Sequence, residues 1–296
     1  MKSGFVSIVG RPNVGKSTLI NSLINRKVAI TSNKMGTTRA NIFGIYNEED
    51  YQIVFVDTPG IGKASSRLNE VLNSKAYQAM ENDIVLFIVD IASGFGPNDE
   101  KILEKLKKDE KPVILVLNKI DDIKKDKLFE QVINLKDKYD FLDIVPISAL
   151  KEKNIKELLK VIKKHLKDDI KYFEDDVITN VSEKFMIEEI IREKVLNLTK
   201  EEVPHAVTVY VENIEYEKTK ILINAVVVVD RDNLKGIIIG KQGSLLKKIG
   251  TLSREELEVF FNKKVYLELF VKTYKDWRNK EKSLIELGIT ELDTKN

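Results

Sequence analysis

The chain has 296 residues, of which 43% are hydrophobic and 32% are charged, and its formal net charge is +2. This length and composition are typical of a globular protein with about two domains. The sequence contains no cysteine, which excludes disulfides, thiolate metal sites and a cysteine nucleophile.

The N-terminal run MKSGFVSIVG enters a strand pattern directly, without the basic and apolar regions of a secretory leader. No apolar run approaches the roughly 20 residues that a membrane-spanning helix needs. We therefore expect a cytoplasmic protein. Because the net charge is near zero, any nucleic-acid partner must be recognised by a local basic patch.

Short apolar runs alternate with helical patterns from residue 5 to about residue 165. The runs are FVSIVG (5–10), YQIVFVDT (51–58), IVLFIVD (84–90), PVILVLNK (112–119) and DIVPIS (143–148). Each run is apolar on both faces, which is typical of parallel strands covered by helices on both sides. The helical patterns lie near 16–26, 67–80, 98–109, 125–139 and 154–166. This alternation predicts a doubly wound, mostly parallel α/β domain.

One run departs from this pattern. Residues 40–49 alternate between apolar and polar, and only a short turn separates them from the run at 51–58. We interpret the two segments as an antiparallel hairpin at the edge of the sheet.

The order of elements changes after an acidic, polar segment at 166–180, which we interpret as a linker. A helix is expected at 186–199, strands at 205–217, 220–231 and 265–274, and a helix–loop–helix unit at 235–261. The order α-β-β-α-α-β predicts a smaller α+β domain. We divide the chain into a first domain (1–167), a linker (168–183) and a second domain (184–296).

The segment GRPNVGKS (10–17) fits the phosphate-binding pattern G-x-x-x-x-G-K-[ST], and it follows a strand and opens a helix. Glycines allow the backbone to wrap around phosphates, and the helix N-terminus adds partial positive charge. Lys16 is expected to reach the β- and γ-phosphates, and Ser17 to ligate Mg²⁺. The expected nucleotide contacts are Gly10, Arg11, Pro12, Asn13, Val14, Gly15, Lys16, Ser17 and Thr18.

A second motif, Asp57-Thr58-Pro59-Gly60, ends a strand at the edge where ligands of open α/β sheets bind. Asp57 is the expected carboxylate for Mg²⁺, held through water. Gly60 lets its N–H approach the γ-phosphate. We include Thr58, Pro59 and the following Ile61 among the nucleotide contacts.

A third motif comprises Asn118, Lys119, Ile120 and Asp121 and follows the strand at 112–119. The Asp121 carboxylate can accept two hydrogen bonds from the ring N–H and the amine of guanine, a donor edge that adenine lacks. Lys119 can lie along the base, and Asn118 can tie this loop to the phosphate-binding loop. Ser148 and Ala149, after the last strand, fit a loop whose backbone N–H reads guanine O6.

The motifs GRPNVGKS, GTTRA, DTPGI, NKID and SAL, in this order and spacing, resemble those of the TrmE–Era–EngA–Septin-like GTPases. The resemblance implies GTP/GDP binding with Mg²⁺ and hydrolysis of GTP to GDP. It assigns the threonine that closes over Mg²⁺ and the γ-phosphate to Thr38, with Thr37 as the alternative. It places switch I at 27–44 and switch II at 57–75. The catalytic residues implied are Lys16, Thr38 and Gly60, and the metal ligands are Ser17, Thr38 and Asp57.

Ile61 stands where Ras-like GTPases carry the glutamine that orients the attacking water. Isoleucine cannot hydrogen-bond water, so we expect slow hydrolysis, with the water placed by backbone groups or by a group supplied from elsewhere. In some relatives the residue matching Asn13 ligates a K⁺ ion. Whether K⁺ acts here stays open.

The second domain carries a local basic patch, since residues 235–250 contain lysines and no acid. Within it, Gly240-Lys241-Gln242-Gly243 is a G-x-x-G loop, whose glycines permit close approach of a sugar–phosphate chain. The expected RNA-binding residues are Lys235, Gly236, Ile239, Gly240, Lys241, Gln242, Gly243, Lys247 and Lys248. We expect the apolar floor of a base-binding groove to comprise Ile237, Ile238, Ile239, Leu246 and Ile249.

The element order and the G-x-x-G loop resemble a type II KH domain. A P-loop GTPase domain followed by such a domain is similar to the Era family over essentially the whole chain. The likeness includes Asp176, Thr179, Phe185, Glu189, Arg192, Glu193 and the closing Asp276-Trp277-Arg278. We interpret Trp277 as a packing anchor.

The Era resemblance implies binding of 16S rRNA near its 3′ end and a role in assembly of the 30S ribosomal subunit. It also implies peripheral contact with the inner face of the cell membrane, and we expect a monomer. Two rivals stay open. The second domain can instead recognise a protein or membrane partner, or the chain can be a P-loop ATPase or kinase, against which Asp121 argues.

Overall fold

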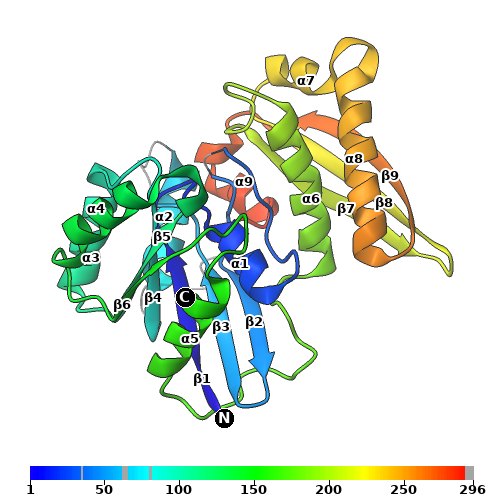
Figure 1. The fold of residues 1–296 in the computed structure, drawn as a ribbon. Coiled ribbons are helices and arrows are strands. Elements are labelled where there is room, and N and C mark those ends of the chain that lie inside the picture. Colours follow the sequence, from blue (N-terminus) through cyan, green and yellow to red (C-terminus); the bar gives the residue numbers. More distant parts are fainter. Residues whose placement is uncertain (35, 62–65, 80–81, 291–296) are drawn as a thin grey trace, which may run out of the picture. The chain divides into compact units, whose positions relative to one another are not determined.

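The computed structural model describes residues 1–34, 36–61, 66–79 and 82–290. The chain separates into two compact units (Figure 1). The first comprises Met1–Thr31, Thr38–Ala64 and Leu72–Val181, and the second comprises Ser32–Thr37, Ser65–Val71 and Ser182–Asn296.

A six-stranded sheet with the order β2-β3-β1-β4-β5-β6 forms the centre of the first unit. Its strands are β1 (Lys2–Val9), β2 (Ile42–Glu48), β3 (Tyr51–Asp57), β4 (Ile84–Asp90), β5 (Val113–Asn118) and β6 (Asp143–Pro146). The pair β2–β3 is antiparallel, as the alternating pattern predicted, and the other neighbouring strands are parallel. The strand order reverses at β1, so the loop after β1 opens into the crevice where α/β proteins bind ligands.

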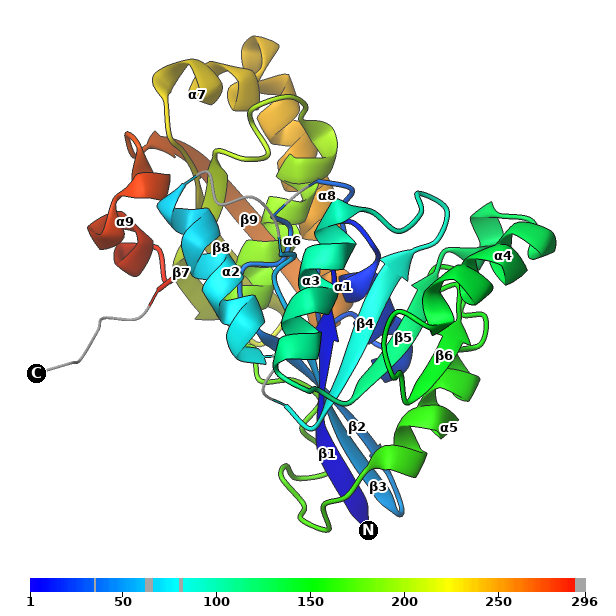
Figure 2. The same ribbon diagram turned by 90° about the vertical axis from the view of Figure 1, so that its left-hand side faces the viewer.

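Helices cover both faces of this sheet. They are α1 (Lys16–Ile24), α2 (Arg67–Ala79), α3 (Pro97–Lys108), α4 (Lys125–Lys136) and α5 (Ile155–His165). Figures 1 and 2 show α1 and α5 on one face and α3 and α4 on the other. All residues of β4 and β5 are buried, because helices pack on both of their sides. The predicted doubly wound α/β fold is confirmed.

Residues 168–181 belong to the first unit and run along its sheet. The Ser3 N–H donates to the carbonyl of Asp168 (2.8 Å), and the Phe43 N–H donates to Asn180 Oδ1 (2.8 Å). Gln52 accepts hydrogen bonds from the N–H groups of Tyr172 and Phe173 at 2.7 and 2.9 Å. This acidic segment is therefore held against β1, β2 and β3 by hydrogen bonds.

The second unit contains a three-stranded sheet with the order β7-β8-β9. Its main elements are α6 (Glu183–Leu198), β7 (Val207–Tyr216), β8 (Lys220–Val229), α7 (Asp232–Ile239), α8 (Ser244–Phe261) and β9 (Lys264–Thr273). The pair β7–β8 is antiparallel and β8–β9 is parallel. This arrangement confirms the smaller α+β fold that the order of elements predicted.

After β9, a short helical turn η3 (Trp277–Asn279) and the helix α9 (Glu281–Glu286) complete the second unit. Trp277 is fully buried, and its indole N–H donates to the carbonyl of Ala206 at 3.2 Å. The tryptophan therefore anchors η3 to the chain segment that precedes β7, as its interpretation as a packing residue predicted.

Candidate functional site

The loop between β1 and α1 contains glycines at positions that tolerate no side chain. Gly15 has φ +99°, and a Cβ atom there would lie 2.3 Å from Asn118 Nδ2. A Cβ atom at Gly10 would lie 2.6 Å from the carbonyl oxygen of Ile88. Because α1 begins directly after Gly15, the unpaired N–H groups of its first turn adjoin this loop and favour an anion.

Lys16, the first residue of α1, lies under this loop. Its side chain is buried (6% exposed), and its Nζ atom donates to the carbonyl oxygens of Gly10 (3.2 Å) and Arg11 (3.0 Å). Burial lowers the pKa of Lys16 to about 8, although attraction to Asp57 acts to raise it. A phosphate group beside this ammonium would favour its charged form.

Ser17, Thr38 and Asp57 converge beside Lys16. Ser17 Oγ lies 2.9 Å from Thr38 Oγ1 and donates to Asp57 Oδ2 at 2.7 Å, and Thr38 Oγ1 lies 3.4 Å from the same oxygen. Thr37 is the alternative switch threonine, but its hydroxyl donates to the Lys34 carbonyl at 2.6 Å. Of the two threonines, Thr38 is the one placed beside Ser17 and Asp57.

The electrostatics of this cluster fit a divalent cation. Burial raises the pKa of Asp57 to about 6, opposed by Lys16 and by the hydroxyls of Ser17 and Thr38. Asp57 Oδ1 is buried and has no hydrogen-bond partner among the residues that the structure describes. Hydroxyl and carboxylate oxygens are the ligands that Mg²⁺ prefers, and it completes its shell with phosphates and water. In a phosphoryl-transfer site, Mg²⁺ neutralises charge on the β- and γ-phosphate oxygens.

No group of three or more His, Cys, Asp or Glu side chains suited to a metal occurs within the described part of the chain. Mg²⁺ bound together with a polyphosphate needs few protein ligands.

Gly60 and Ile61 follow β3 close to the same loop. A Cβ atom at Gly60 would lie 2.9 Å from the Cα atom of Pro12, so glycine permits this close approach. The Ile61 side chain is 6% exposed and belongs to an apolar cluster with Phe87. It therefore offers no hydrogen bond to a water molecule. The hydroxyl of Thr58 donates to the Ile8 carbonyl at 2.8 Å and braces the strand end.

Parts of the predicted switches lie outside the described residues, namely residue 35 of switch I and residues 62–65 of switch II.

Asn118 joins the base-recognition motif to the phosphate-binding loop. Its Nδ2 donates to the Val14 carbonyl at 2.8 Å, and its Oδ1 accepts from the Ala149 N–H at 3.0 Å. The Ser148 N–H donates to the Lys153 carbonyl at 3.1 Å. A bond from the Ala149 N–H to guanine O6 would therefore have to be shared with Asn118.

Asp121 lies exposed in the short turn η1 (Ile120–Asp122), directly after Lys119. Lys119 itself has φ 67°, in the left-handed region that non-glycine residues rarely adopt. Asp121 is exposed in this tight turn, and the Ile120 N–H donates to the Ile147 carbonyl at 3.2 Å.

Two carboxylates near these loops were not predicted from the sequence. Asp90 Oδ2 lies 2.7 Å from Lys119 Nζ, and Asp99 Oδ2 lies 3.2 Å from Arg11 Nε. Asp90 is the last residue of β4, at the strand edge where α/β proteins gather ligand-binding groups. From that rule, Asp90 could have been identified as a candidate in the sequence. The pairing of Arg11 with Asp99 could be identified only in the structure.

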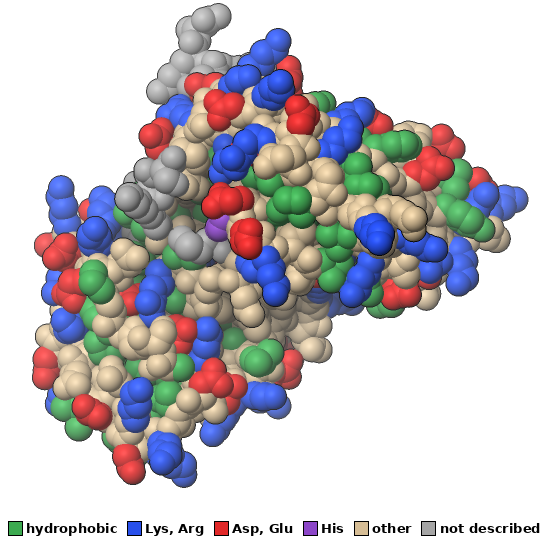
Figure 3. All heavy atoms as spheres, turned by 90° about the horizontal axis from the view of Figure 1, so that it is seen from above, with side chains coloured by type: hydrophobic (Ala, Val, Ile, Leu, Met, Phe, Trp, Pro, Cys, Tyr) green, Lys and Arg blue, Asp and Glu red, His purple; other side chains and the backbone are tan. Residues whose placement is uncertain are grey.

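Charged side chains of both signs are interspersed over the face of the molecule seen in Figure 3. This agrees with the net charge of +2. A nucleic-acid site must therefore be identified from a shaped surface rather than from bulk charge.

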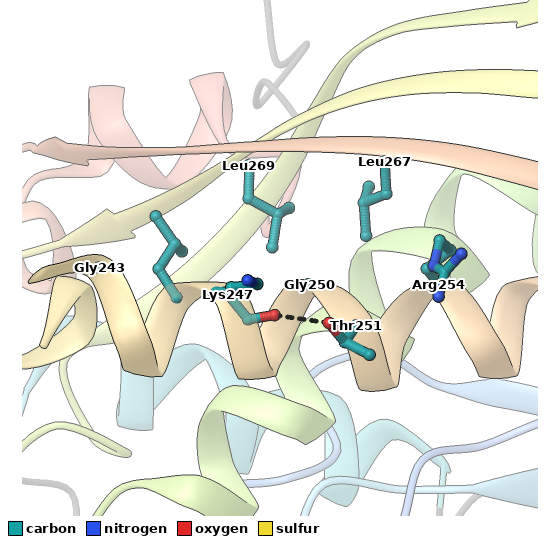
Figure 4. Close-up of a pocket in the computed structure, with 8 residues that line it drawn as sticks. Gly243, Lys247, Gly250, Thr251, Arg254, Leu267 and Leu269 are labelled. Carbon is teal, nitrogen blue, oxygen red and sulfur yellow. Dashed lines mark hydrogen bonds between the residues drawn. The ribbon is translucent and has the colours of Figure 1, made fainter.

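Such a surface lies in the second unit, between α8 and β9. A hollow of about 440 Å³ is lined by Gly243, Leu246, Lys247, Gly250, Thr251, Arg254, Leu267 and Leu269. Leu267 and Leu269 point from β9 toward α8, and Lys247 and Arg254 extend from α8 (Figure 4). The hollow thus combines an apolar wall with cationic side chains.

The two glycines of the G-x-x-G loop differ in their surroundings. Gly240 has φ +72°, and a Cβ atom there would lie 2.9 Å from Leu245. Gly243 has φ +78°, but a Cβ atom there would meet no described atom within 4 Å. Gly240 is therefore needed for packing of the loop, while Gly243 borders the open hollow. Lys241 and Gln242, between them, are exposed.

The predicted apolar floor was partly wrong. Ile238 and Ile249 are fully buried in the core, because α7 and α8 turn these positions inward, and Ile237 is half exposed. Leu246 does line the hollow, and the other apolar lining comes from β9. Arg254 was missed although it lies seven residues after Lys247, a helical spacing that places both on one face. The contribution of β9 required the tertiary structure.

Comparison with known proteins agrees with this arrangement. Residues 5–119 match the family model described as "50S ribosome-binding GTPase", and residues 202–278 match the KH domain model. A crystal structure of a point variant of Aquifex aeolicus Era bound to GDP·AlF₄⁻ is 42% identical, with a TM-score of 0.95, over 98% of this chain and 100% of that one. A structure of Era with MgGDPNP and nucleotides 1506–1542 of 16S ribosomal RNA is also 42% identical, with a TM-score of 0.95. That match covers 98% of this chain and 99% of the other.

The likeness extends over both units. The chain therefore belongs to the Era family and is a GTPase.

Proposed function

We propose that the pocket around the loop of residues 10–17 holds GTP or GDP with Mg²⁺. Lys16 contacts the β- and γ-phosphates, Ser17 and Thr38 ligate Mg²⁺, and Asp57 holds the ion through water. Gly60 brings its N–H to the γ-phosphate. The convergence of Ser17, Thr38 and Asp57 within hydrogen-bond distance of one another supports this assignment most directly.

Asp121 selects guanine by accepting hydrogen bonds from its ring N–H and amine. An Asp121→Asn variant should shift the preference from guanine toward xanthine nucleotides, because an amide can donate to the second carbonyl oxygen of xanthine. Competition between GDP and XDP for the purified protein measures this shift. An unchanged preference would contradict the assignment of the base.

We propose that the second unit binds single-stranded RNA, and that the RNA is the 3′ region of 16S rRNA, the ligand of the Era complex described above. Through this binding the protein would assist assembly of the 30S ribosomal subunit. The observation that carries the proposal is the hollow between α8 and β9, which adjoins the G-x-x-G loop. Unstacked bases can enter such an apolar hollow while the loop glycines approach the sugar–phosphate chain.

Gly243→Asp tests this proposal because it adds bulk and negative charge at the border of the hollow, where there is room for a side chain. Binding of a labelled oligonucleotide with the 3′ sequence of 16S rRNA should weaken at least about tenfold, a loss of about 1.4 kcal/mol, because the carboxylate would repel the sugar–phosphate chain that the loop approaches. The matched control is Gly288→Asp, since Gly288 also has a positive φ (+67°) and open surroundings among the described residues. The control should bind RNA as the unchanged protein does.

The rival proposal is that the second unit recognises a protein or a membrane. Within the described residues, no helix is both long enough and apolar enough to cross a bilayer. Full RNA binding by Gly243→Asp would favour the rival. In that case, flotation of the protein with vesicles containing anionic lipid would separate a membrane partner from a protein partner.

We also propose that hydrolysis is slow, because the buried Ile61 side chain cannot orient water. Asn13, exposed in the phosphate-binding loop at φ 65°, is the residue we assign to a K⁺ ion. Replacing K⁺ by Na⁺ in the assay should then slow GTP hydrolysis, and Asn13→Ala should remove the difference. Equal rates in the two salts would exclude this role.

A further inference from the structure

We propose that Asp90 is a positioning residue for guanine recognition, acting through the side chain of Lys119. The inference rests on the proposed guanine site, in which Lys119 lies along the base. Neither the motifs nor the family comparison assigns a role to Asp90.

The contact between the two residues is close and partly sheltered. Asp90 Oδ2 lies 2.7 Å from Lys119 Nζ, with the two side chains 13% and 34% exposed. Asp90 and Asn118 are register partners at the ends of β4 and β5, so the strand pairing itself places the carboxylate beside residue 119. The Ile91 N–H donates to the Asn118 carbonyl at 3.0 Å and extends this pairing past the strand ends.

The carboxylate is itself held in place. Asp90 Oδ1 accepts hydrogen bonds from the N–H groups of Ala92 (3.1 Å) and Ser93 (3.2 Å). Burial acts to raise the pKa of Asp90, but the hydrogen bonds from Lys119 and Ser93 bring it below its ordinary value. Asp90 is thus a fixed anion rather than a mobile surface charge.

Lys119 needs such support because its backbone adopts the left-handed conformation (φ 67°, ψ 39°). Residues other than glycine rarely adopt that conformation, because it brings Cβ close to the following carbonyl oxygen. It also sets the direction in which the chain leaves β5 and presents Asp121. An anion that holds the ammonium keeps the stem of Lys119 extended along the face of the expected base.

The loop that follows Asp90 connects this support to the phosphate site. Arg11 Nη2 donates to Ser93 Oγ at 2.6 Å and to the Gly94 carbonyl at 2.8 Å. Asp99, which pairs with Arg11, also accepts from the Gly96 N–H at 2.9 Å. The base-recognition and phosphate-binding loops are therefore braced twice, once by Asn118 and once through Asp90 and residues 93–99.

Asp90→Asn tests the inference because asparagine keeps the Oδ1 acceptor and removes the charge facing Lys119. We expect GDP affinity to fall about fivefold, the upper range for an ion pair that is not fully buried. The decisive measurement is a double-mutant cycle with Lys119→Met. If Asp90 acts through Lys119, the double variant binds GDP no more weakly than Lys119→Met alone. Independent, additive losses would overturn the proposal.

A second readout separates base positioning from a general loss of structure. Tripolyphosphate occupies the phosphate loop without a base. Its own dissociation constant, calculated from competition with the measured GDP affinity of each protein, should therefore be the same for Asp90→Asn and the unchanged protein. An equal weakening of tripolyphosphate and GDP would show that Asp90 supports the phosphate loop or the fold instead, which also overturns the proposal. Asp109→Asn is the matched control, because it removes another carboxylate that pairs with a lysine, Lys105 at 2.9 Å.

If Asp90→Asn does not fold, Asp90→Glu replaces it. The longer side chain keeps the charge but displaces the ammonium, so GDP affinity should fall at least about twofold, and Lys119→Met should remove the difference. Failure of the guanine site itself is distinguishable. It would appear as an unchanged base preference in Asp121→Asn, whereas Asp90→Asn should alter affinity without altering that preference.

Discussion

Gly15 illustrates how a single backbone position joins the phosphate-binding and base-recognition loops. Its φ of +99° ends the loop and starts α1, and the space that a side chain would take is occupied by the amide of Asn118. That amide donates to Val14 and accepts from Ala149. Gly15 is therefore required both for the positive φ and for the space that the Asn118 amide occupies. Residues with a side chain do not meet these requirements.

Gly15→Ala should therefore weaken GDP binding by at least about tenfold, since both the strained φ and the clash displace Asn118. The control, Gly288→Ala, carries a comparable positive φ without a described atom near the new Cβ, so it isolates strain. Titration with a fluorescent GDP analogue measures the loss. Tight binding by Gly15→Ala would show that Asn118 can move without consequence.

Among the helices and strands, α8 carries the cationic side of the hollow proposed to bind RNA. Lys247 and Arg254 lie on one face of this helix, opposite the leucines of β9 (Figure 4). The apolar wall suits bases, while the cations suit phosphates, so the two sides contribute differently to binding.

The salt dependence of RNA binding should distinguish the contribution of the cationic side chains of α8 from that of the leucines of β9. Each phosphate contact to a single strand adds about 0.7 to the slope of log affinity against log salt concentration. Lys247→Ala should lower the slope by that amount for the 16S rRNA oligonucleotide. Lys164→Ala, an exposed lysine on α5 of the first unit, should leave it unchanged. Leu269→Ala should weaken binding at every salt concentration with the slope preserved.

The short turn η3 contributes stability through Trp277. Trp277→Ala removes a fully buried indole and its hydrogen bond to Ala206, and should lower the free energy of unfolding of the second unit by about 3–5 kcal/mol. Trp277→Phe should cost less, because it keeps most of the volume and loses mainly the hydrogen bond. Urea titration followed by circular dichroism checks both. If both variants lower the free energy of unfolding equally, Trp277 stabilises the unit through its hydrogen bond rather than through packing.

At the scale of the whole molecule, the question is whether nucleotide and RNA are coupled. Residues 32–34 and 36–37 of predicted switch I fall in the second compact unit together with the KH elements, while Thr38 falls in the first. The chain therefore passes from one unit to the other directly beside the threonine assigned to Mg²⁺. This chain connection is the reason to test whether nucleotide binding and the proposed RNA binding are coupled.

If a GTP analogue strengthens RNA binding relative to GDP by some factor, then RNA must strengthen binding of that analogue relative to GDP by the same factor. Measuring both affinities, each in the presence and absence of the other ligand, checks this equality. If this ratio of affinities equals one in both measurements, the nucleotide site and the RNA site are independent. The nucleotide then does not control RNA binding.

The amino-acid sequence was sufficient to predict the fold classes of both units and the chemistry that we propose for the nucleotide pocket. Contiguous motifs such as residues 10–17 and 118–121 encode a backbone shape and its functional groups together, because neighbours in the chain are neighbours in space. Alternating apolar runs likewise predicted the parallel sheet, since burial on both faces leaves a local pattern. The G-x-x-G loop and the order of elements sufficed for the KH fold.

Contacts between residues that lie far apart in the chain could be identified only in the folded structure. The structure placed Thr38 rather than Thr37 beside Asp57, paired Asp90 with Lys119, and formed one wall of the hollow beside α8 from β9. The structure also buries Ile238 and Ile249 in the core, although the sequence pattern suggested that these residues line a groove. The physical reason is that these outcomes depend on strand order and helix rotation. Both are set by packing of the whole unit and leave no contiguous pattern in the sequence.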